Sequence, residues 1–228
     1  MAAQRRHRGF TLHTQVSSLS SPQPALLEAL GLECIRGDRL LFSDLNLSLQ
    51  AGRLLQVEGP NGAGKTSLLR ILCGLSTPSQ GEVRWCGEPI HKVREEFFAE
   101  VSYLGHHHGV KGDLTARENV RIANELSKAR SVAVVQDVLQ RVGLENFSDV
   151  PARTLSLGQQ RRVALGRLLA TQTQLWVLDE PLAALDIKGV ELVEKMLSEH
   201  LLQGGMAVVS THQPLSVQHA HVIHLNLA

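Results

Sequence analysis

The sequence predicts an α/β fold with an N-terminal antiparallel β subdomain, a core of buried strands and helices, and an inserted α-helical subdomain. Near the start of the chain, two apolar stretches are joined by a short turn, which is typical of an antiparallel strand pair. Further along, short apolar runs alternate with segments of helical periodicity, as in an α/β core. Between two of these runs, residues 110–155 contain no strand-like segment, which indicates the helical insertion.

Length and composition limit the classes of function. The 228 residues fit one large α/β domain, which we place at 25–228. A formal net charge of +1 does not favour a nucleic-acid partner. No apolar run approaches the roughly 20 residues that span a bilayer, so a membrane role would require a partner. Cys34, Cys73 and Cys86 are dispersed and odd in number, which disfavours a disulfide framework and favours a reducing compartment.

Residues 1–24 predict a flexible N-terminal tail. They contain several arginines and serines, and no acidic residue occurs before Glu28. An organellar transit peptide has a similar composition, and a start codon assigned too far upstream would also explain it. No apolar segment of a secretory signal is present, and we interpret the stretch as a tail.

The N-terminal subdomain is predicted to begin with two strands, at residues 30–35 and 40–49, joined by a turn at 36–39. In the second strand, leucines alternate with polar residues, so one face of this sheet should be exposed to solvent. Residues 54–58 predict a short buried strand, and the apolar residues between 68 and 75 have helical spacing.

Between that strand and that helix lies Gly-Pro-Asn-Gly-Ala-Gly-Lys-Thr, which fits the phosphate-binding P-loop pattern. Such a loop turns its backbone N–H groups toward a phosphate, and the following helix offers its positive end. Lys65 is expected to reach the β- and γ-phosphates, and the Thr66 hydroxyl to bind Mg²⁺. A glycine-rich turn with an incidental lysine is the alternative, which the flanking elements disfavour. The nucleotide-binding residues predicted here are Gly59, Pro60, Asn61, Gly62, Ala63, Gly64, Lys65, Thr66 and Ser67.

The remaining elements follow in order. Thr115 and Glu118 form a predicted capping box for a helix that runs to about residue 128, and Ser131 is a candidate cap for the next helix, which ends near 143. With the helix after residue 159, this block forms a helical subdomain at about 110–170. The other predicted elements are strands at 82–86, 101–104, 175–180, 206–210 and 221–227, the last at an edge, and a helix at 188–202.

Two carboxylates end the strand at 175–180. Because α/β sheets bind ligands at the carboxyl ends of their strands, we expect Asp179 to hold Mg²⁺ directly or through water. Glu180 is placed to act as general base or to position a nucleophilic water. His212 follows another apolar strand and could point at a terminal phosphate, although a lone histidine at a strand end is more often structural.

Two histidine groups raise the question of a metal site. They are His106, His107 and His108, and His219, His221 and His224. Adjacent strand residues point to opposite faces, so neither spacing by itself directs the rings to one ion, and we favour other roles.

Residues 155–159, Leu-Ser-Leu-Gly-Gln, resemble the Leu-Ser-Gly-Gly-Gln signature of ABC-type ATPases. Residues 183–186 resemble the D-loop of that family, and His212 matches its switch histidine. The resemblance extends from about residue 25 to the C-terminus. It implies a RecA-like P-loop NTPase core, ATP and Mg²⁺ as cofactors, and an ATP-binding subunit of an ABC transporter.

In that family, two ATPase domains enclose two nucleotides, with the P-loop of one facing the signature of the other. The resemblance therefore implies that Ser156, Gly158 and Gln159 contact ATP held by a partner chain. Since this chain has one P-loop and one signature, a complete site would need a second copy or a related subunit.

Finer motifs at residues 105–111, 159–165 and 211–215 look like those of the heme exporter ATPases of cytochrome c maturation. This resemblance implies a peripheral subunit on the cytoplasmic face of a bacterial inner membrane. It would act with integral membrane permease subunits in heme export or in release of a heme-loaded chaperone, with ATP hydrolysis as the energy source.

Three positions depart from the wider ABC pattern. His106 replaces the Q-loop glutamine, and its imidazole would respond to pH near neutrality. Arg36 stands where an aromatic residue usually stacks on adenine; a guanidinium can also stack on a base, so base selectivity stays open. Leu157 replaces a signature glycine, while Ser156 and Gly158 are retained.

Several other functions compete with heme export. The same ATPase would serve a transporter of lipid, drug or metal. A soluble ABC protein acting on DNA or ribosomes usually has coiled-coil insertions or tandem ATPase domains, which this sequence lacks. A regulatory module without turnover is disfavoured by the presence of Glu180.

Overall fold

The computed structural model describes residues 12–13, 26–106, 109–127, 135–218 and 220–227. The predicted N-terminal tail apart from residues 12–13, the candidate cap Ser131, and His107, His108 and His219 lie outside the described residues. Within the described part, no helix is both long and apolar enough to cross a membrane. The same part contains no group of three or more His, Cys, Asp or Glu side chains arranged to hold a metal ion.

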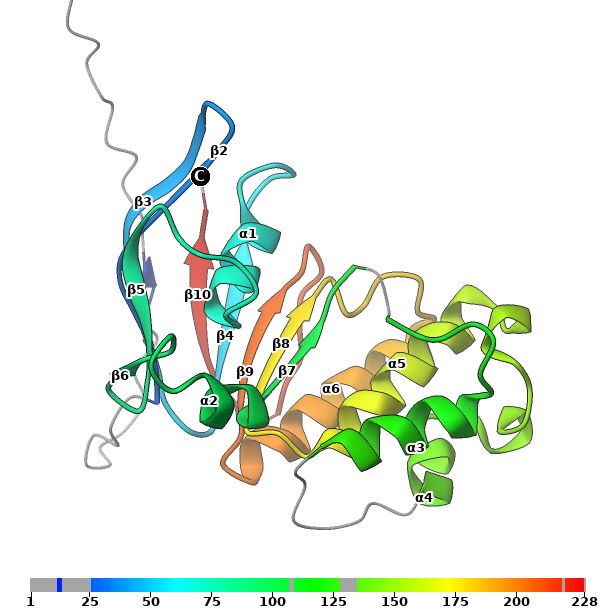
Figure 1. Cartoon of the computed structure of the whole chain (residues 1–228). Coiled ribbons are helices and arrows are strands. Elements are labelled where there is room, and N and C mark those ends of the chain that lie inside the picture. Colours follow the sequence, from blue (N-terminus) through cyan, green and yellow to red (C-terminus); the bar gives the residue numbers. More distant parts are fainter. Residues whose placement is uncertain (1–11, 14–25, 107–108, 128–134, 219, 228) are drawn as a thin grey trace, which may run out of the picture.

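An antiparallel sheet forms the N-terminal side of the molecule (Figure 1). Its strands are ordered β3-β2-β5-β6. Leu45, Leu47 and Leu49 are buried and alternate with exposed residues, which confirms the predicted one-sided strand. The bounds are β2 Leu27–Arg36, β3 Arg39–Leu49, β5 Gln80–Trp85 and β6 Glu88–Pro89.

A second sheet, mainly parallel, occupies the centre and is ordered β1-β10-β4-β9-β8-β7. All neighbours pair in parallel except β1, which runs antiparallel to β10. The expectation that residues 221–227 form an edge strand is wrong, because β10 pairs with β4 on one side and with β1 on the other. The bounds are β1 Leu12–His13, β4 Arg53–Glu58, β7 Val101–Leu104, β8 Leu175–Asp179, β9 Met206–Ser210 and β10 His221–Asn226.

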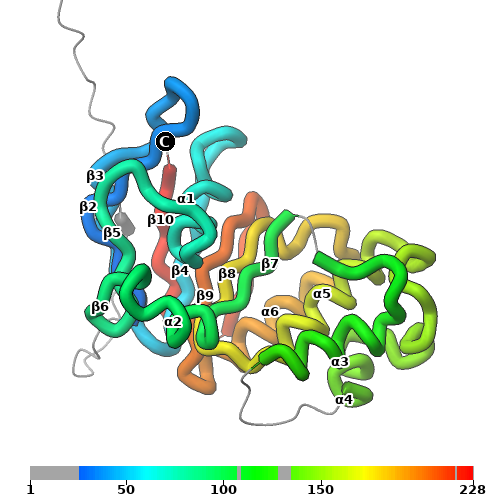
Figure 2. Tube along the Cα trace, viewed as in Figure 1, coloured from blue at the N-terminus to red at the C-terminus, as the bar shows by residue number. Residues whose placement is uncertain are grey.

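Both faces of the parallel sheet are covered, which explains why β8 and β9 are buried along their whole lengths. Helix α1 (Lys65–Leu72) packs between the two sheets, in the core that includes Leu175 and Val177. The alternate residues Trp176 and Leu178 pack in the opposite core with α5 (Leu157–Thr171) and α6 (Ile187–Leu202). Figure 2 shows the resulting layers, with α1 and the antiparallel sheet on one side of the parallel sheet and α5 and α6 on the other.

The predicted insertion is helical. Helices α3 (Ala116–Leu126) and α4 (Val135–Arg141) pack against each other and against α5 (Figure 1). The capping box of Thr115 and Glu118 is confirmed, with the Glu118 N–H donating to Thr115 Oγ1 and the Thr115 N–H donating to Glu118 Oε2. Two short 3₁₀ helices, Glu145–Phe147 and Ala152–Thr154, complete the block.

Two further details differ from the sequence-based expectation. Leu75 lies beyond the end of α1 and is half exposed, because the chain turns at Gly74 with a φ of 72°. Helix α2 (Arg94–Glu100) was not predicted; it is short, and only Phe97 is fully buried.

Candidate active site

The loops that follow the parallel strands meet at one edge of the sheet. The glycine-rich loop follows β4, Glu180 follows β8, and His212 follows β9. Because all these strands run in the same direction, residues far apart in sequence come together at their carboxyl ends. This edge is the one that the sequence predicts for the site.

The loop at 59–66 has the geometry of an anion cradle. Gly59, Gly62 and Gly64 have φ values of 140°, 80° and 104°, a region that side chains disfavour. A Cβ at Gly59 would lie 2.3 Å from the Leu227 carbonyl oxygen, so only glycine fits. Gly64 caps α1 without a side-chain hydrogen bond, which leaves the first N–H groups of the helix available to a ligand.

Lys65 is largely buried at the start of α1. Its Nζ donates to the carbonyl oxygens of Gly59 at 2.7 Å and Pro60 at 3.3 Å, and lies 3.1 Å from His212 Nε2. These contacts hold the ammonium group within the glycine-rich loop, where it can compensate the charge of a phosphate.

Thr66 and Asp179 bring together two oxygen atoms that can bind a metal ion. Thr66 Oγ1 donates to Asp179 Oδ2 at 2.7 Å, although the residues are 113 positions apart. Asp179 is only 3% exposed. A hydroxyl and a carboxylate are the hard oxygen ligands that Mg²⁺ prefers, so this pair fits the predicted metal.

Glu180 and His212 face each other beside the loop. His212 Nε2 lies 3.4 Å from Glu180 Oε1 and 3.2 Å from Asn61 Oδ1, so the imidazole connects the glycine-rich loop to the carboxylate. Glu180 adopts a φ of 48°, an uncommon conformation for a residue with a side chain. Such strained backbone is frequent at functional sites.

Arg161 is a site residue that the sequence did not reveal. It is 1% exposed in α5, and its guanidinium donates to the carbonyl oxygens of Gly105, Asp179, Glu180 and Pro181. Burial lowers its pKa to about 10, opposed by the nearby carboxylates of Asp179 and Glu180. Arg161 therefore ties α5 to the loops that follow β7 and β8.

Ser210 and Tyr103 are two further residues whose place at the site the sequence did not reveal. The Ser210 hydroxyl donates to Asp179 Oδ1 at 2.6 Å. Burial raises the pKa of Tyr103 to about 12, and the negative charge of Asp179 adds to the effect. Both side chains belong to strands whose apolar character predicts only packing, so a serine at the end of a wholly buried strand was the one available signal.

The segment predicted to act on a partner chain begins α5. The Gln159 N–H donates to Ser156 Oγ at 3.2 Å, and the Ser156 N–H donates to Gln159 Oε1 at 2.9 Å. The cap uses an oxygen lone pair of Ser156, so its hydroxyl proton stays available to another acceptor. Helix α5 packs against β7, whereas the glycine-rich loop follows β4, with β9 and β8 between them in the sheet.

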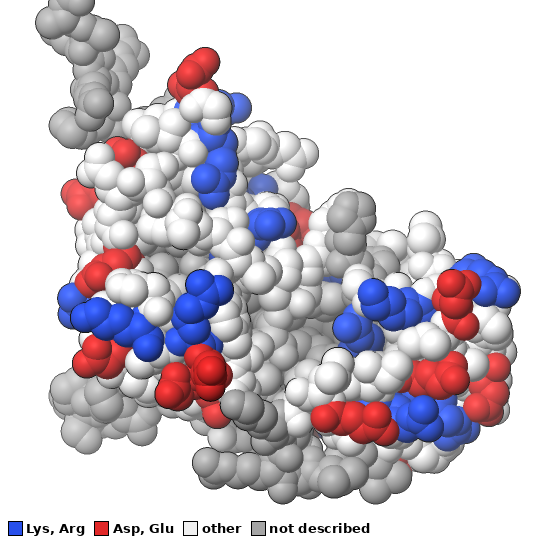
Figure 3. Space-filling view, in the orientation of Figure 1, with Lys and Arg blue, Asp and Glu red and all other residues white. Residues whose placement is uncertain are grey.

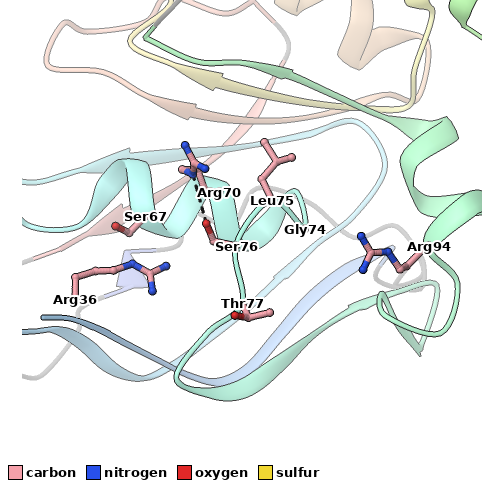
Figure 4. A pocket seen from close by; sticks show the side chains of 8 residues that line it. All are labelled: Arg36, Ser67, Arg70, Gly74, Leu75, Ser76, Thr77 and Arg94. Atoms are coloured by element: carbon pink, nitrogen blue, oxygen red, sulfur yellow. Dashed lines mark hydrogen bonds between the residues drawn. The ribbon is translucent and has the colours of Figure 1, made fainter.

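His106 and Arg36 lie at the margins of the site. His106 is exposed just beyond the end of β7, at the same sheet edge as Asp179. Arg36 ends β2 and, with Ser67 and Arg70, lines a cavity of about 660 Å³ beside α1 (Figure 4). The other lining residues are Gly74, Leu75, Ser76, Thr77 and Arg94. This cavity extends from Ser67 with arginine and hydroxyl groups along its walls.

Outside this cavity, the visible face in Figure 3 carries both signs of charge. Acidic and basic side chains are interspersed over the helical side. Several form exposed ion pairs, such as Arg117 with Asp149 and Arg153 with Asp113. The pattern agrees with the net charge of +1.

Known proteins have sequences and folds similar to those of this chain. A family model described as ABC transporter matches residues 42–183. A relative from Methylococcus capsulatus, named Cytochrome c biogenesis ATP-binding export protein CcmA, is 55% identical over 195 residues, covering 85% of this chain and 94% of the relative. A protein of the same name from Escherichia coli K12 is 44% identical over 202 residues, covering 89% and 96%.

Solved structures show the same fold. A putative ABC transporter ATP-binding protein from Pyrococcus furiosus has a TM-score of 0.73 and 25% identity, covering 88% of this chain and 96% of its own. A dimeric ATP-binding cassette in a post-hydrolysis state, bound to ADP and Pi, has a TM-score of 0.75 and 23% identity, covering 89% and 96%. From the family match over more than half of its length and from relatives this similar, the chain belongs to the ABC transporter family of ATP-binding proteins.

Proposed function

We propose that the chain is the ATP-hydrolysing subunit of an ABC-type membrane complex for heme export or heme-chaperone release in c-type cytochrome biogenesis. The observation that carries the ATPase assignment is the contact of Thr66 Oγ1 with Asp179 Oδ2, which joins the glycine-rich loop to the carboxylate of β8. The printed names of the relatives from Methylococcus capsulatus and Escherichia coli support the role in cytochrome c biogenesis.

The residues of the glycine-rich loop bind the triphosphate. The Ala63 N–H is held by the Pro60 carbonyl oxygen within the loop, so the backbone N–H groups of Lys65 and Thr66 at the start of α1 contact the phosphate oxygens. The ammonium group of Lys65 turns from the Gly59 carbonyl to the β- and γ-phosphates. Ser67, next along α1, binds nearer the α-phosphate. The ribose and base then extend into the cavity beside Ser67, where the Arg36 guanidinium stacks on the base.

Thr66 and Asp179 hold Mg²⁺. The ion, when bound, supplies positive charge against the phosphate oxygens. Glu180 accepts a hydrogen bond from the attacking water and orients it, while His212, whose Nε2 lies 3.4 Å from Glu180 Oε1, contacts the terminal phosphate. His106, at the end of β7, contributes a further polar group near this water.

A second copy of the chain completes the site. Ser156, Gly158 and Gln159 at the start of α5 contact the nucleotide of the partner, with the free Ser156 hydroxyl proton directed at the γ-phosphate. Integral membrane permease subunits bind the dimer, which acts as a peripheral subunit on the cytoplasmic face of a bacterial inner membrane. No nucleic acid takes part.

Glu180→Gln tests the catalytic part of the proposal. The amide keeps the size of the side chain but cannot act as a base, so ATP binding should persist while turnover falls about 100-fold or more. Lys65→Ala is the contrasting variant and should lose nucleotide binding itself. Equal turnover in Glu180→Gln and the unaltered protein would exclude the role given to Glu180.

Isolation of the complex tests the transport part. The tagged chain, purified from its host in mild detergent, should bring integral membrane subunits of a heme-delivery system with it. Recovery of a permease unrelated to heme would instead assign the ATPase to another transporter.

A further inference from the structure

Ser210 occupies the point where the two functional carboxylate residues meet. It is the last residue of β9, is 0% exposed, and lies directly opposite Asp179 in the pairing of β8 with β9. Its Oγ lies 2.6 Å from Asp179 Oδ1 and 3.1 Å from the backbone nitrogen of Glu180. One hydroxyl therefore contacts both residues to which the proposed function gives roles in hydrolysis.

The directions of these two hydrogen bonds follow from their chemistry. The Asp179 carboxylate only accepts, so the Ser210 hydroxyl must donate its proton to Oδ1. The Glu180 N–H only donates, so it uses a lone pair of Ser210 Oγ. A hydroxyl is the smallest side-chain group that satisfies a carboxylate and an N–H group together.

The first bond fixes the orientation of the Asp179 carboxylate. With Oδ1 held by Ser210, the other oxygen, Oδ2, faces Thr66 Oγ1 at 2.7 Å. This is the pair that the proposed function assigns to Mg²⁺. Without the Ser210 hydroxyl, the carboxylate would lose the bond that opposes rotation about its Cβ–Cγ axis.

The second bond supports the strained backbone of Glu180. Its N–H also reaches the Ser210 carbonyl oxygen at 3.1 Å, and its own carbonyl accepts from Arg161 at 2.7 Å. These bonds hold Glu180 at a φ of 48°, and the backbone in turn sets the direction of its side chain.

We propose that Ser210 is a positioning residue for the ATPase site, which aims Asp179 Oδ2 at the metal and holds Glu180 in its working conformation. This inference rests on the proposed function. Ser210 does not contact the nucleotide; it acts through Asp179 and Glu180. Removing the hydroxyl should therefore lower kcat and reduce the ATP affinity that is gained from Mg²⁺. The binding of ATP in the absence of metal should change less.

Ser210→Thr and Ser210→Val form a matched pair for the test. Both are β-branched, nearly equal in volume and suited to a strand, but only Thr keeps a hydroxyl. We would measure ATP affinity with and without Mg²⁺ by calorimetry, the Mg²⁺ dependence of kcat and KM, and the melting temperature. Comparing the two variants cancels the effect of the added methyl group on packing.

The expected result is that Ser210→Val loses about 10- to 100-fold in kcat and in the affinity gained from Mg²⁺, relative to Ser210→Thr. A purely structural role would lower the melting temperature of Ser210→Val while leaving the Mg²⁺ response of the two variants equal. Equal Mg²⁺ responses and equal kcat in the two variants would overturn the inference while leaving the ATPase proposal standing. An unaltered protein without Mg²⁺-dependent binding or hydrolysis of ATP would overturn both.

Discussion

His200 makes the stability of this fold depend on pH. Its ring stacks on Trp176, with centroids 3.9 Å apart and planes 5° from parallel, and a Cβ at Gly205 would lie 2.3 Å from the ring on closest approach. His200 Nε2 also lies 3.0 Å from the Met206 carbonyl oxygen. Burial lowers the pKa of His200 from 6.5 to about 4, because the charged imidazolium would lose its hydration.

The sign of the effect follows from proton uptake. Between pH 6.5 and about 4 the unfolded chain binds a proton at His200 and the folded chain does not, so acid favours unfolding. The stabilisation is fully present above pH 6.5 and is lost as the pH falls toward 4. From this shift, lowering the pH from 7.5 to 5 should cost about 2 kcal/mol, and a fall below pH 4 about 3 kcal/mol.

The assay is urea unfolding at pH 7.5 and pH 5.0, followed by circular dichroism, for the unaltered chain and for His200→Phe. Phenylalanine keeps a planar ring against Trp176 but does not titrate, so its pH dependence should be smaller by about 2 kcal/mol. Loss of the bond to Met206 lowers the stability of the variant equally at both pH values. If the free energy of unfolding of the two proteins falls by the same amount between pH 7.5 and pH 5.0, His200 is not a neutral buried group in the folded chain.

Two further variants test other parts of the structure. Arg161→Met removes the donor to four carbonyl groups, and leaving buried acceptors unpaired should lower the free energy of unfolding by at least about 2 kcal/mol, measured by urea unfolding. A loss below 0.5 kcal/mol would contradict that role. Arg36→Tyr should tighten ATP binding about threefold or more in calorimetry, since an aromatic ring stacks well on a base, whereas Arg36→Ala should weaken it. Unchanged affinity in both Arg36 variants would place the base elsewhere.

Much of the site could be predicted from sequence because it depends on local patterns and one topological rule. The glycine-rich loop is contiguous, Asp179 ends an apolar strand, and His212 follows another. Parallel strands carry their carboxyl ends to a single edge, so the meeting of Thr66 with Asp179 follows from strand direction. The capping box of Thr115 is also local and was predicted, whereas the equally local box of Ser156 and Gln159 was not.

What the sequence did not reveal depends on register and on helix rotation. Ser210 meets Asp179 only because β8 and β9 pair in one register, and a shift of one residue would move the side chain to the other face. Arg161 lies among charged and polar neighbours in a helix, and its burial depends on which face of α5 turns toward the sheet. Helix α2 was missed because one turn of buried surface around Phe97 leaves little periodicity.

The hydrogen bonds of Arg161 and Ser210 to the Glu180 backbone link the two ATP sites of the proposed dimer. Arg161 belongs to α5, the helix that begins at Ser156, yet it binds the carbonyl groups of Asp179 and Glu180 beside the site of its own chain. In the proposed dimer, the start of α5 contacts the nucleotide of the partner. A displacement of α5 by that nucleotide would therefore pull on the backbone that carries Glu180, and Ser210 holds that backbone from the other side. The two ATP sites of such a dimer should be coupled through these bonds, because α5 cannot move relative to the Glu180 backbone without stretching them.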